Sequence, residues 1–492
     1  MSYKHGIYGA VAASNNATEI AQGTVPAYIG SAPVHRINTD GSADFDYSGY
    51  VNKPILISSL REAREMGLYS DDWDTYTLSE VIHAHFSNGV QSVAPFVLLN
   101  ILDPKTDVDA DAATATVTMK KSGTKFVGSI EDPLCCLDGI TFTAEGATIG
   151  KTNYHYDGDV VVIEAEATVT SGANVFTLSA TYKQIAFSAE KFDATNVANA
   201  LAMLDYCEQL TGVIPNVLAA PGISEVPELH SLMVQKAIDK ISGKWNLVVL
   251  SDIPASVETY EDAIAWKDEH AYDSKFDKVF WPAVSYNDKV YHLSTIGAFM
   301  MQYTDIQNDN IPYVSTSNKT LFCDRAVVGE NETLLISEEK ANSCNQVGIT
   351  TVNSVKRSLR LWGSHMSNYN HTKLSSINAE DRFDAPVRMM MYILNYLQQQ
   401  YINEIDQPFT GKDIDSIENS VQTWLDSLVN DGALLAATVS FNNESNTEAD
   451  IANGDLVFEL MVTYSVMAKS ITFKLQYTSA GLVNILNAGG NE

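Results

Sequence analysis

The chain has 492 residues, of which 45% are apolar and 19% are charged, and this length corresponds to about three domains of ordinary size. Acidic residues outnumber basic ones 61 to 31, a formal net charge of −30, which argues against nucleic acid and anionic membranes as partners of the whole chain. Five cysteines without a CxxC pair form no disulfide framework, and no apolar run is long enough to span a membrane. We therefore expect free thiols, no signal peptide and synthesis in a reducing cytoplasm. The low charged fraction favours extensive contacts with other chains.

Residues 1–24 are predicted to form an arm. Tyr3, Ile7 and Val11 share one face of an extended strand, and Gly23 and Pro26 then interrupt any regular element. No packing partner for this strand lies nearby in the sequence.

Residues 25–104 have the pattern of an α/β domain. Short apolar runs predict strands at 25–30 and 54–57, and apolar spacing predicts a helix at 77–86. The near-continuous apolar run at 94–102 is typical of a strand in a sheet that is covered on both faces.

Residues 105–187 differ in composition from both neighbouring segments. They are rich in Thr, Val, Gly and Ala, with a turn signal about every ten residues. We interpret them as an all-β domain inserted into a parent domain. Apolar and polar residues alternate in five predicted strands, at 114–119, 125–130, 141–144, 159–169 and 175–182.

Helices and strands alternate again in residues 188–355, which favours a partly parallel sheet built from right-handed crossovers. The predicted helices are 195–210, 229–241 and 260–270, and the predicted strands are 216–222, 247–250 and 278–284.

A net-basic stretch at 356–388 opens the last large segment, residues 356–469. Arg357, Arg360, Arg382 and Arg388 could face a partner, or they could pair internally with Glu380, Asp381 and Asp384. Two helices are predicted to follow, at 386–405 and 414–429, and then a pair of alternating strands at 456–464 and 471–477.

The sequence contains no convincing catalytic, cofactor or metal site. It lacks a phosphate loop, GxGxxG after a strand, HExxH and GxSxG. His83 and His85 lie two residues apart on a helix and point to different faces, so we interpret them as ordinary helix residues. Cys135 and Cys136 point to opposite faces of a strand, so joint ligation of a metal ion by the two thiols is not expected.

Asp305 and Asp309 fall in a polar stretch without the glycine and glutamate of a calcium loop, which predicts a solvated loop. Asp252 ends a predicted strand, where α/β proteins place ligands, but no convergent acid, base or nucleophile accompanies it.

Both ends of the chain carry alternating strands whose edges need a partner. Residues 3–11 and about 470–478 could add to sheets of neighbouring chains, or they could pair within their own subunit. The residue pattern alone leaves both alternatives open.

Fourteen short passages, in order along the chain, resemble the contractile tail sheath proteins of myophages and phage-tail-like bacteriocins. The resemblance that they carry extends over about two thirds of the chain and leaves out the insertion at 105–187, and Thr316 stands where the family pattern has proline. The passages are residues 3–8 (YKHGIY), 32–35 (APVH), 52–57 (NKPILI), 67–73 (GLYSDDW), 76–78 (YTL), 99–104 (LNILDP), 289–294 (KVYHLS), 311–319 (IPYVSTSNK), 361–363 (LWG), 381–383 (DRF), 387–390 (VRMM), 432–434 (GAL), 446–447 (NT) and 471–473 (ITF).

This resemblance implies a structural, non-enzymatic subunit without cofactors that stacks helically around an inner tube and contracts to drive the tube through a target envelope. It implies further copies of the chain, the tube protein, and baseplate and tail terminator proteins as partners, with assembly in the bacterial host cytoplasm and residence in a virion tail or tail-like particle. Another virion or surface-array protein, such as a baseplate component or adhesin, and an α/β enzyme are the alternatives.

The expected fold is α+β and α/β multidomain, with α/β core domains, an inserted all-β domain and terminal strand-exchange arms. Strand exchange is expected at Tyr3, Ile7, Val11, Ile471, Phe473 and Leu475, and a surface near the tube at Arg357, Arg360, Arg382 and Arg388. The expected segments are a 1–24 arm, a 25–104 outer α/β domain continued at 188–355, the 105–187 insertion on the outer surface, a 356–469 inner domain and a 470–492 C-terminal arm.

Overall fold

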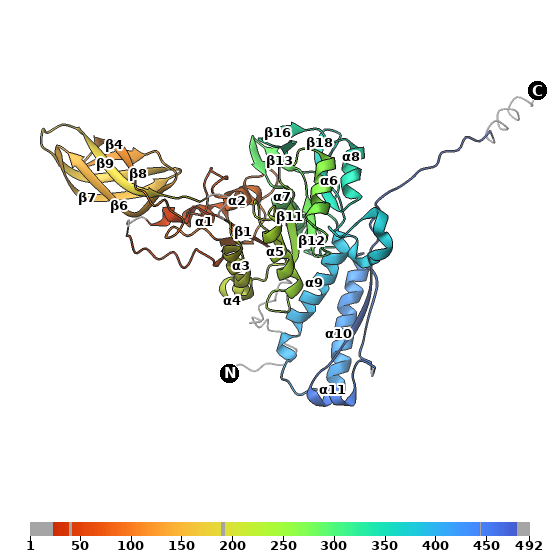
Figure 1. Ribbon diagram of the computed structural model, residues 1–492. Helices are drawn as coiled ribbons and strands as arrows, with labels where there is room; N and C mark the ends of the chain where they lie inside the picture. Colours follow the sequence, from red (N-terminus) through yellow and green to blue (C-terminus); the bar gives the residue numbers. More distant parts are fainter. Residues whose placement is uncertain (1–22, 39–41, 188–191, 443, 480–492) are drawn as a thin grey trace, which may run out of the picture.

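The computed structural model describes residues 23–38, 42–187, 192–442 and 444–479. Within these residues the chain is a multidomain protein of mixed helix and sheet. Figure 1 shows a central α/β domain, a β insertion at one end of the molecule and a C-terminal domain of helices and a hairpin that projects from the centre. The candidate strand at residues 3–11 lies outside the described residues.

An eight-stranded mixed sheet forms the centre of the α/β domain. Its six inner strands are parallel, as the alternation of helices and strands predicted, and each edge strand runs antiparallel to its neighbour. In spatial order the strands are β18 (Ser358–Trp362), β17 (Ile349–Val355), β12 (Asp277–Phe280), β11 (Val248–Asp252), β10 (Val217–Ala219), β1 (Pro26–Gly30), β3 (Phe96–Asn100) and β2 (Pro54–Ile57).

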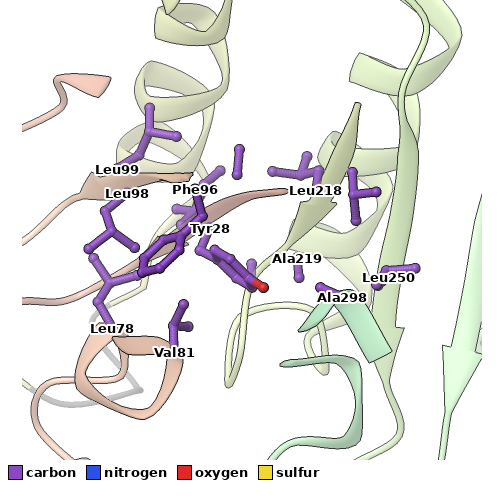
Figure 2. Close-up of a cluster of buried hydrophobic side chains, with 14 of the residues drawn as sticks. Tyr28, Leu78, Val81, Phe96, Leu98, Leu99, Leu218, Ala219, Leu250 and Ala298 are labelled. Atoms are coloured by element: carbon purple, nitrogen blue, oxygen red, sulfur yellow. The ribbon is translucent and has the colours of Figure 1, made fainter. Parts of the chain in front are cut away.

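Helices pack against this sheet and bury its apolar strands. All residues of β1, β3 and β11 are buried, which explains their near-continuous apolar sequences. Figure 2 shows Tyr28, Leu98 and Leu218 from the strands in one cluster with Leu78 of α2 and Ala298 of α7. The helices of this domain are α1 (Leu60–Glu65), α2 (Leu78–Phe86), α3 (Ala194–Met203), α4 (Cys207–Thr211), α5 (Pro227–Asp239), α6 (Tyr260–Glu269), α7 (Leu293–Ile306) and α8 (Glu338–Asn345).

The strand predicted at 278–284 is in fact two strands in two sheets. β12 ends at Phe280, and β13 (Ala283–Tyr286) joins a separate four-stranded sheet with β14 (Lys289–Tyr291), β15 (Arg325–Val328) and β16 (Glu332–Leu334). Pro282 separates the two strands, and because proline has no N–H it cannot continue a ladder of hydrogen bonds.

The β insertion is a six-stranded antiparallel sheet with a hydrophobic core of its own. Five of its strands were predicted; β7 was missed because a register shift between Ile149 and Thr152 interrupts its alternation of inward and outward residues. The order is β6 (Cys135–Glu145), β9 (Val175–Gln184), β4 (Ala113–Ser122), β5 (Lys125–Ile130), β8 (Val160–Val169) and β7 (Ala147–Asp157). The segment enters and leaves at one place, since Ala186 N donates to Asp107 O at 2.9 Å.

One buried arginine attaches the insertion to the α/β domain. Arg36 Nη1 lies 2.7 Å from Asp159 Oδ1 and 3.2 Å from Gly158 O, both in the turn between β7 and β8. Its Nη2 donates to Ser70 Oγ of the α/β domain at 3.2 Å. The guanidinium therefore joins the two units through charge-assisted hydrogen bonds.

The C-terminal domain is built from two long helices and a two-stranded hairpin. α9 (Asp384–Gln400) and α10 (Gly411–Asn430) pack with β19 (Leu434–Ser440) and β20 (Glu459–Tyr464), and the short helix α11 (Glu448–Asn453) lies between the strands in sequence. Thr410 and Asp413 form a capping box that starts α10. β20 was predicted, but its partner is β19, for which the Ala-rich sequence gave no strand signal, and not residues 471–477.

Candidate assembly interface

The hairpin of β19 and β20 covers one side of α10 with an apolar row that is only half buried. Leu460, Val462 and Tyr464 of β20 lie on the covered face and are partly buried in the core that also contains Leu425 of α10, which is fully buried. Met461, on the opposite face of β20, is 70% exposed. Two strands are therefore too few to bury this apolar face within the subunit.

The C-terminal extension, residues 465–479, follows β20 and runs away from the body of the molecule (Figure 1). The predicted strand at 470–478 does not form within the described subunit, because no strand lies beside it. Its apolar residues are almost fully exposed: Ile471 72%, Phe473 91%, Leu475 100% and Tyr477 85%. An alternating apolar strand in water requires an external partner.

Two contacts direct this extension away from the hairpin. Ser465 Oγ donates to Gly432 O at 2.6 Å, and Lys469 Nζ donates to the hydroxyl of Tyr369 at 3.3 Å. Lys469 lies beside a groove of about 810 Å³ that Trp362 and Tyr369 also line. The extension therefore leaves the subunit past β18, at the end of the C-terminal domain nearest the central sheet.

A buried ion pair joins the C-terminal domain to the α/β domain. Arg388 of α9 bonds to both carboxylate oxygens of Asp305 on α7, and its Nη2 also donates to Thr24 Oγ1 at 3.0 Å. Burial raises the pKa of Asp305, and the Arg388 guanidinium opposes this shift. One prediction is corrected here: Asp305 is a buried residue of α7 and not part of a solvated loop. Arg388 is buried at this joint, where it can support the C-terminal domain but does not present its guanidinium at the subunit surface.

The other three arginines predicted to lie near the tube are found in different environments. Arg357 is exposed in the turn between β17 and β18. Arg360 Nη1 donates to Asn318 Oδ1 at 2.9 Å, and Arg382 Nη2 donates to the main-chain oxygens of Leu374 and Ile377 at 2.8 and 2.7 Å.

The predicted internal pairing of these arginines with nearby carboxylates is also absent among the described ion pairs. Asp381 instead pairs with Lys275, and Asp384 pairs with the buried Lys278 at 2.9 Å. Arg357 is consequently the one residue of the four whose cationic group faces solvent without a described partner.

Polar groups at the carboxyl ends of the central strands satisfy one another. Asp252 accepts hydrogen bonds from the main-chain N–H of Ser294, at 2.8 Å, and from its hydroxyl, and burial raises the pKa of Asp252 to about 7. His292 lies 2.8 Å from Glu80 and 3.4 Å from Glu225. Burial disfavours the charged imidazole, but the two carboxylates outweigh it and raise the pKa of His292 well above its usual value.

This network links α2, β11 and α7, and it has no serine–histidine pair, because Ser294 bonds to Asp252 rather than to His292. Within the described residues, no group of three His, Cys, Asp or Glu side chains could hold a metal ion. None of the helices in the described part of the chain is both long enough and apolar enough to cross a membrane. The hairpin of β19 and β20, with its half-buried apolar face, and the exposed C-terminal extension are therefore the strongest candidates for a contact site with other chains. They indicate a subunit of a larger assembly.

Comparison with known proteins supports that class. No protein-family model matches the chain. The tail sheath protein of Burkholderia phage BcepMu is 24% identical over 524 residues, covering 96% of both chains, and that of Escherichia phage P2 is 22% identical over 291 residues, covering 57% of this chain and 68% of the relative. The contracted helical sheath of the anti-feeding prophage has the same fold, with a TM-score of 0.54, 12% identity, and coverage of 97% of this chain and all of the other. A chain in the baseplate structure of that particle gives a TM-score of 0.55, also at 12% identity, with 97% and 100% coverage.

The fold and the unpaired strands define a structural protein that assembles with further copies. Over nearly its full length the chain is similar to a phage tail sheath protein, and its fold is that of a contractile sheath subunit, so the comparisons support the role of a structural sheath subunit.

Proposed function

We propose that the subunits polymerise helically around an inner tube by exchanging terminal strands, and that contraction of this array drives the tube through a target envelope. The observation that carries the proposal is the exposure of Phe473 and Leu475, at 91% and 100%, in an alternating segment at the end of the described chain. Burying each large apolar side chain in a neighbour contributes about 1.5–3 kcal/mol, and each ladder hydrogen bond about 1 kcal/mol.

Strand exchange suits a contracting array. A head-to-tail contact repeated with a rotation that does not close produces a helix of subunits. Main-chain ladders between subunits can persist while the folded domains rotate as rigid bodies, and two packings of the same subunits supply the two states. Tyr3, Ile7 and Val11 are proposed to contribute the second exchanged strand.

The proposed organisation assigns residues 1–24 and 470–492 to the two arms, and residues 25–104 with 188–355 to an outer α/β domain. Residues 356–469 form the inner domain nearest the tube. We place the insertion at 105–187 on the outside of the sheath, because a unit absent from the family pattern would collide with the tube if it faced inward.

The proposed partners are further copies of this chain, an inner tube protein, and baseplate and terminator proteins, with assembly in the host cytoplasm. Nucleic acid and direct membrane insertion have no part in the proposal. Arg357 and Arg360 are candidates for contact with an acidic tube, an attraction that salt would weaken. We propose no catalytic activity, since the family is structural and the polar network around Asp252 is paired internally.

Electron microscopy of the purified chain tests this function. Wild-type protein should form cylinders by itself, whereas a baseplate component or an adhesin would not. A variant lacking residues 1–14 should keep the circular dichroism spectrum of the folded subunit but form no cylinders. Normal cylinders from that variant would exclude an essential N-terminal exchange strand.

A further inference from the structure

The tight turn between β17 and β18 holds two long cationic side chains in an unfavourable backbone conformation. Val355 pairs with Ser358, so the loop of this hairpin consists of Lys356 and Arg357. Both residues have positive φ, 51° and 69°, as the central residues of a type I′ turn do. Asparagine and glycine normally fill these positions, because a longer side chain crowds the backbone in the left-handed region.

Other two-residue hairpin turns of this chain follow that preference. β13 and β14 are joined by Asn287 and Asp288, with φ of 51° and 61°, and in the turn between β4 and β5 the residue with positive φ is Gly123. The turn between β17 and β18 departs from it. Because strained backbone residues cluster at functional sites, this departure points to a role for the two side chains themselves.

The cationic groups of the turn have no acidic partner in the described part of the subunit. Lys356 and Arg357 are exposed, and no described ion pair includes either of them. Glu338 and Glu339, which begin the neighbouring helix α8, do not pair with them either. In a chain of net charge −30, two adjacent free cations are suited to an acidic surface outside the subunit.

This turn lies at the end of the α/β domain that is remote from the C-terminal domain. β17 runs parallel to β12, so the turn after β17 lies at the same end of the central sheet as the four-stranded sheet that follows β12. Figure 1 shows β13 and β16 of that sheet at the top of the molecule and α11 at the bottom. The turn is therefore far from the domain that we place nearest the tube.

The C-terminal domain carries the opposite charge. Lys412 is the only lysine or arginine in residues 389–468, and acidic residues are spread along this whole stretch. Glu404 and Asp406 lie in the connection between α9 and α10, and Asp455 follows α11, so all three lie at the end of the domain that points away from the central sheet. Their side chains are exposed and belong to no described ion pair.

We infer that the turn formed by Lys356 and Arg357 in one copy binds the acidic end of the C-terminal domain of another copy, at Glu404, Asp406 and Asp455. This inference rests on the proposed assembly of copies into a sheath and adds a head-to-tail contact to it. The two sites lie at opposite ends of the subunit, and a contact between opposite ends of successive copies repeats into a helix. Exposed ion pairs are individually weak and are screened by salt, which suits a contact that must break when the array changes state.

Charge reversal in cylinders grown from the purified chain, without tube protein, tests this contact. The reversed turn is Lys356→Glu with Arg357→Glu, and the reversed end is Glu404→Lys with Asp406→Lys. Each variant should fold by circular dichroism but need about tenfold more protein than the wild type to form cylinders, because exposed ion pairs are lost and like charges meet. An equimolar mixture of the two should assemble like the wild type, since each reversed surface then meets a complementary one on the other variant.

Two further variants separate the side chains from general charge and from turn geometry. Lys120→Glu with Lys121→Glu makes the same charge change at an adjacent exposed pair in the insertion and should assemble normally. Lys356→Asn with Arg357→Gly supplies the residues that a type I′ turn prefers, so the midpoint of thermal unfolding should rise while assembly again needs about tenfold more protein. A turn with a purely structural role would gain stability and assemble as before.

The outcomes distinguish the partners. Normal assembly of both turn variants without tube protein would overturn the inference, and failure of their cylinders to retain the tube would then identify the turn as a tube contact. Impaired turn variants that the reversed end does not rescue would overturn the choice of the C-terminal domain as partner. Absence of cylinders from the wild type and from the insertion variant would contradict the proposed function, and the inference with it.

Discussion

The β insertion and the terminal hairpin show two ways in which alternating strands can be completed. In the insertion, Val161, Leu178 and Ala180 are fully buried. In the hairpin, Leu460, Val462 and Tyr464 are only half buried, and Met461 is 70% exposed. The insertion buries its apolar face without help, whereas the hairpin needs strands from elsewhere.

The difference lies in how each sheet treats its edges. The outermost strands of the insertion, β6 and β7, are joined through the single residue Gly146, and Phe142 of β6 packs against Tyr154 of β7, so the sheet folds over its own apolar face. The hairpin has too few strands to fold over its own apolar face. Side chains from α10 form hydrogen bonds with main-chain groups on the outer edge of β19, and none is described on the outer edge of β20. A sheet that covers its own apolar face can be carried as an appendage, while a hairpin with an uncovered apolar face and an open edge can join chains.

The largest expected effect comes from Phe473→Asp. A carboxylate in the exchanged strand would have to be buried in the neighbouring subunit, so we expect a folded subunit by circular dichroism and no cylinders by electron microscopy. Thr472→Asp is the matched control, because its side chain points to the opposite face, and it should still assemble. Normal cylinders from Phe473→Asp would show that the hairpin does not need the extension.

The next largest effects are expected from replacing Arg388, which joins the C-terminal domain to the α/β domain, and Arg36, which joins the β insertion to it. Arg388→Met leaves the Asp305 carboxylate buried and should lower the free energy of unfolding by about 3–5 kcal/mol in urea titrations. Adding Asp305→Leu should recover most of that loss. Arg36→Met should cost less, because the side chain of its partner Asp159 is 36% exposed and can stay solvated. Equal losses at Arg36 and Arg388 would remove this distinction between the two attachments.

A pH effect of about 3 kcal/mol is expected at His365, near the base of the extension. Burial lowers the pKa of His365 to about 4, and its Nδ1 lies 2.9 Å from the main-chain oxygen of Arg382. The folded chain thus favours the neutral imidazole, and this contribution to stability is complete above pH 6.5 and lost as the pH falls toward 4. His365→Gln should show a shallower loss of unfolding free energy over that range; an unchanged slope would contradict the assignment.

The smallest expected effect is that of deleting the insertion. Asp107 and Ala186 are hydrogen-bonded neighbours, so a short linker can replace residues 107–186 without moving the parent domain. We expect cylinders of normal length by electron microscopy. A soluble deletion variant that failed to assemble would show that the insertion takes part in contacts between subunits.

Much of this organisation was predictable from the sequence, because it depends on local patterns. Period-two alternation located five of the six strands of the insertion, and apolar runs located five of the six parallel strands of the central sheet, all except β17. The ordered passages indicated a resemblance to contractile tail sheath proteins, and the full-length similarity to one such protein supports it. The alternation at 471–477 also marked the segment that is left exposed, because apolar residues at every second position need a sheet wherever that sheet comes from.

Only the tertiary structure decided the contacts between residues far apart in the chain. It paired β20 with the Ala-rich β19, brought Arg388 to Asp305 across 83 positions, and divided residues 278–284 between two sheets. It also set Gln422 against β19 and left β20 open. Local propensity does not encode such choices, because hydrogen bonds and buried charges are satisfied by whichever groups the packed helices and strands bring together.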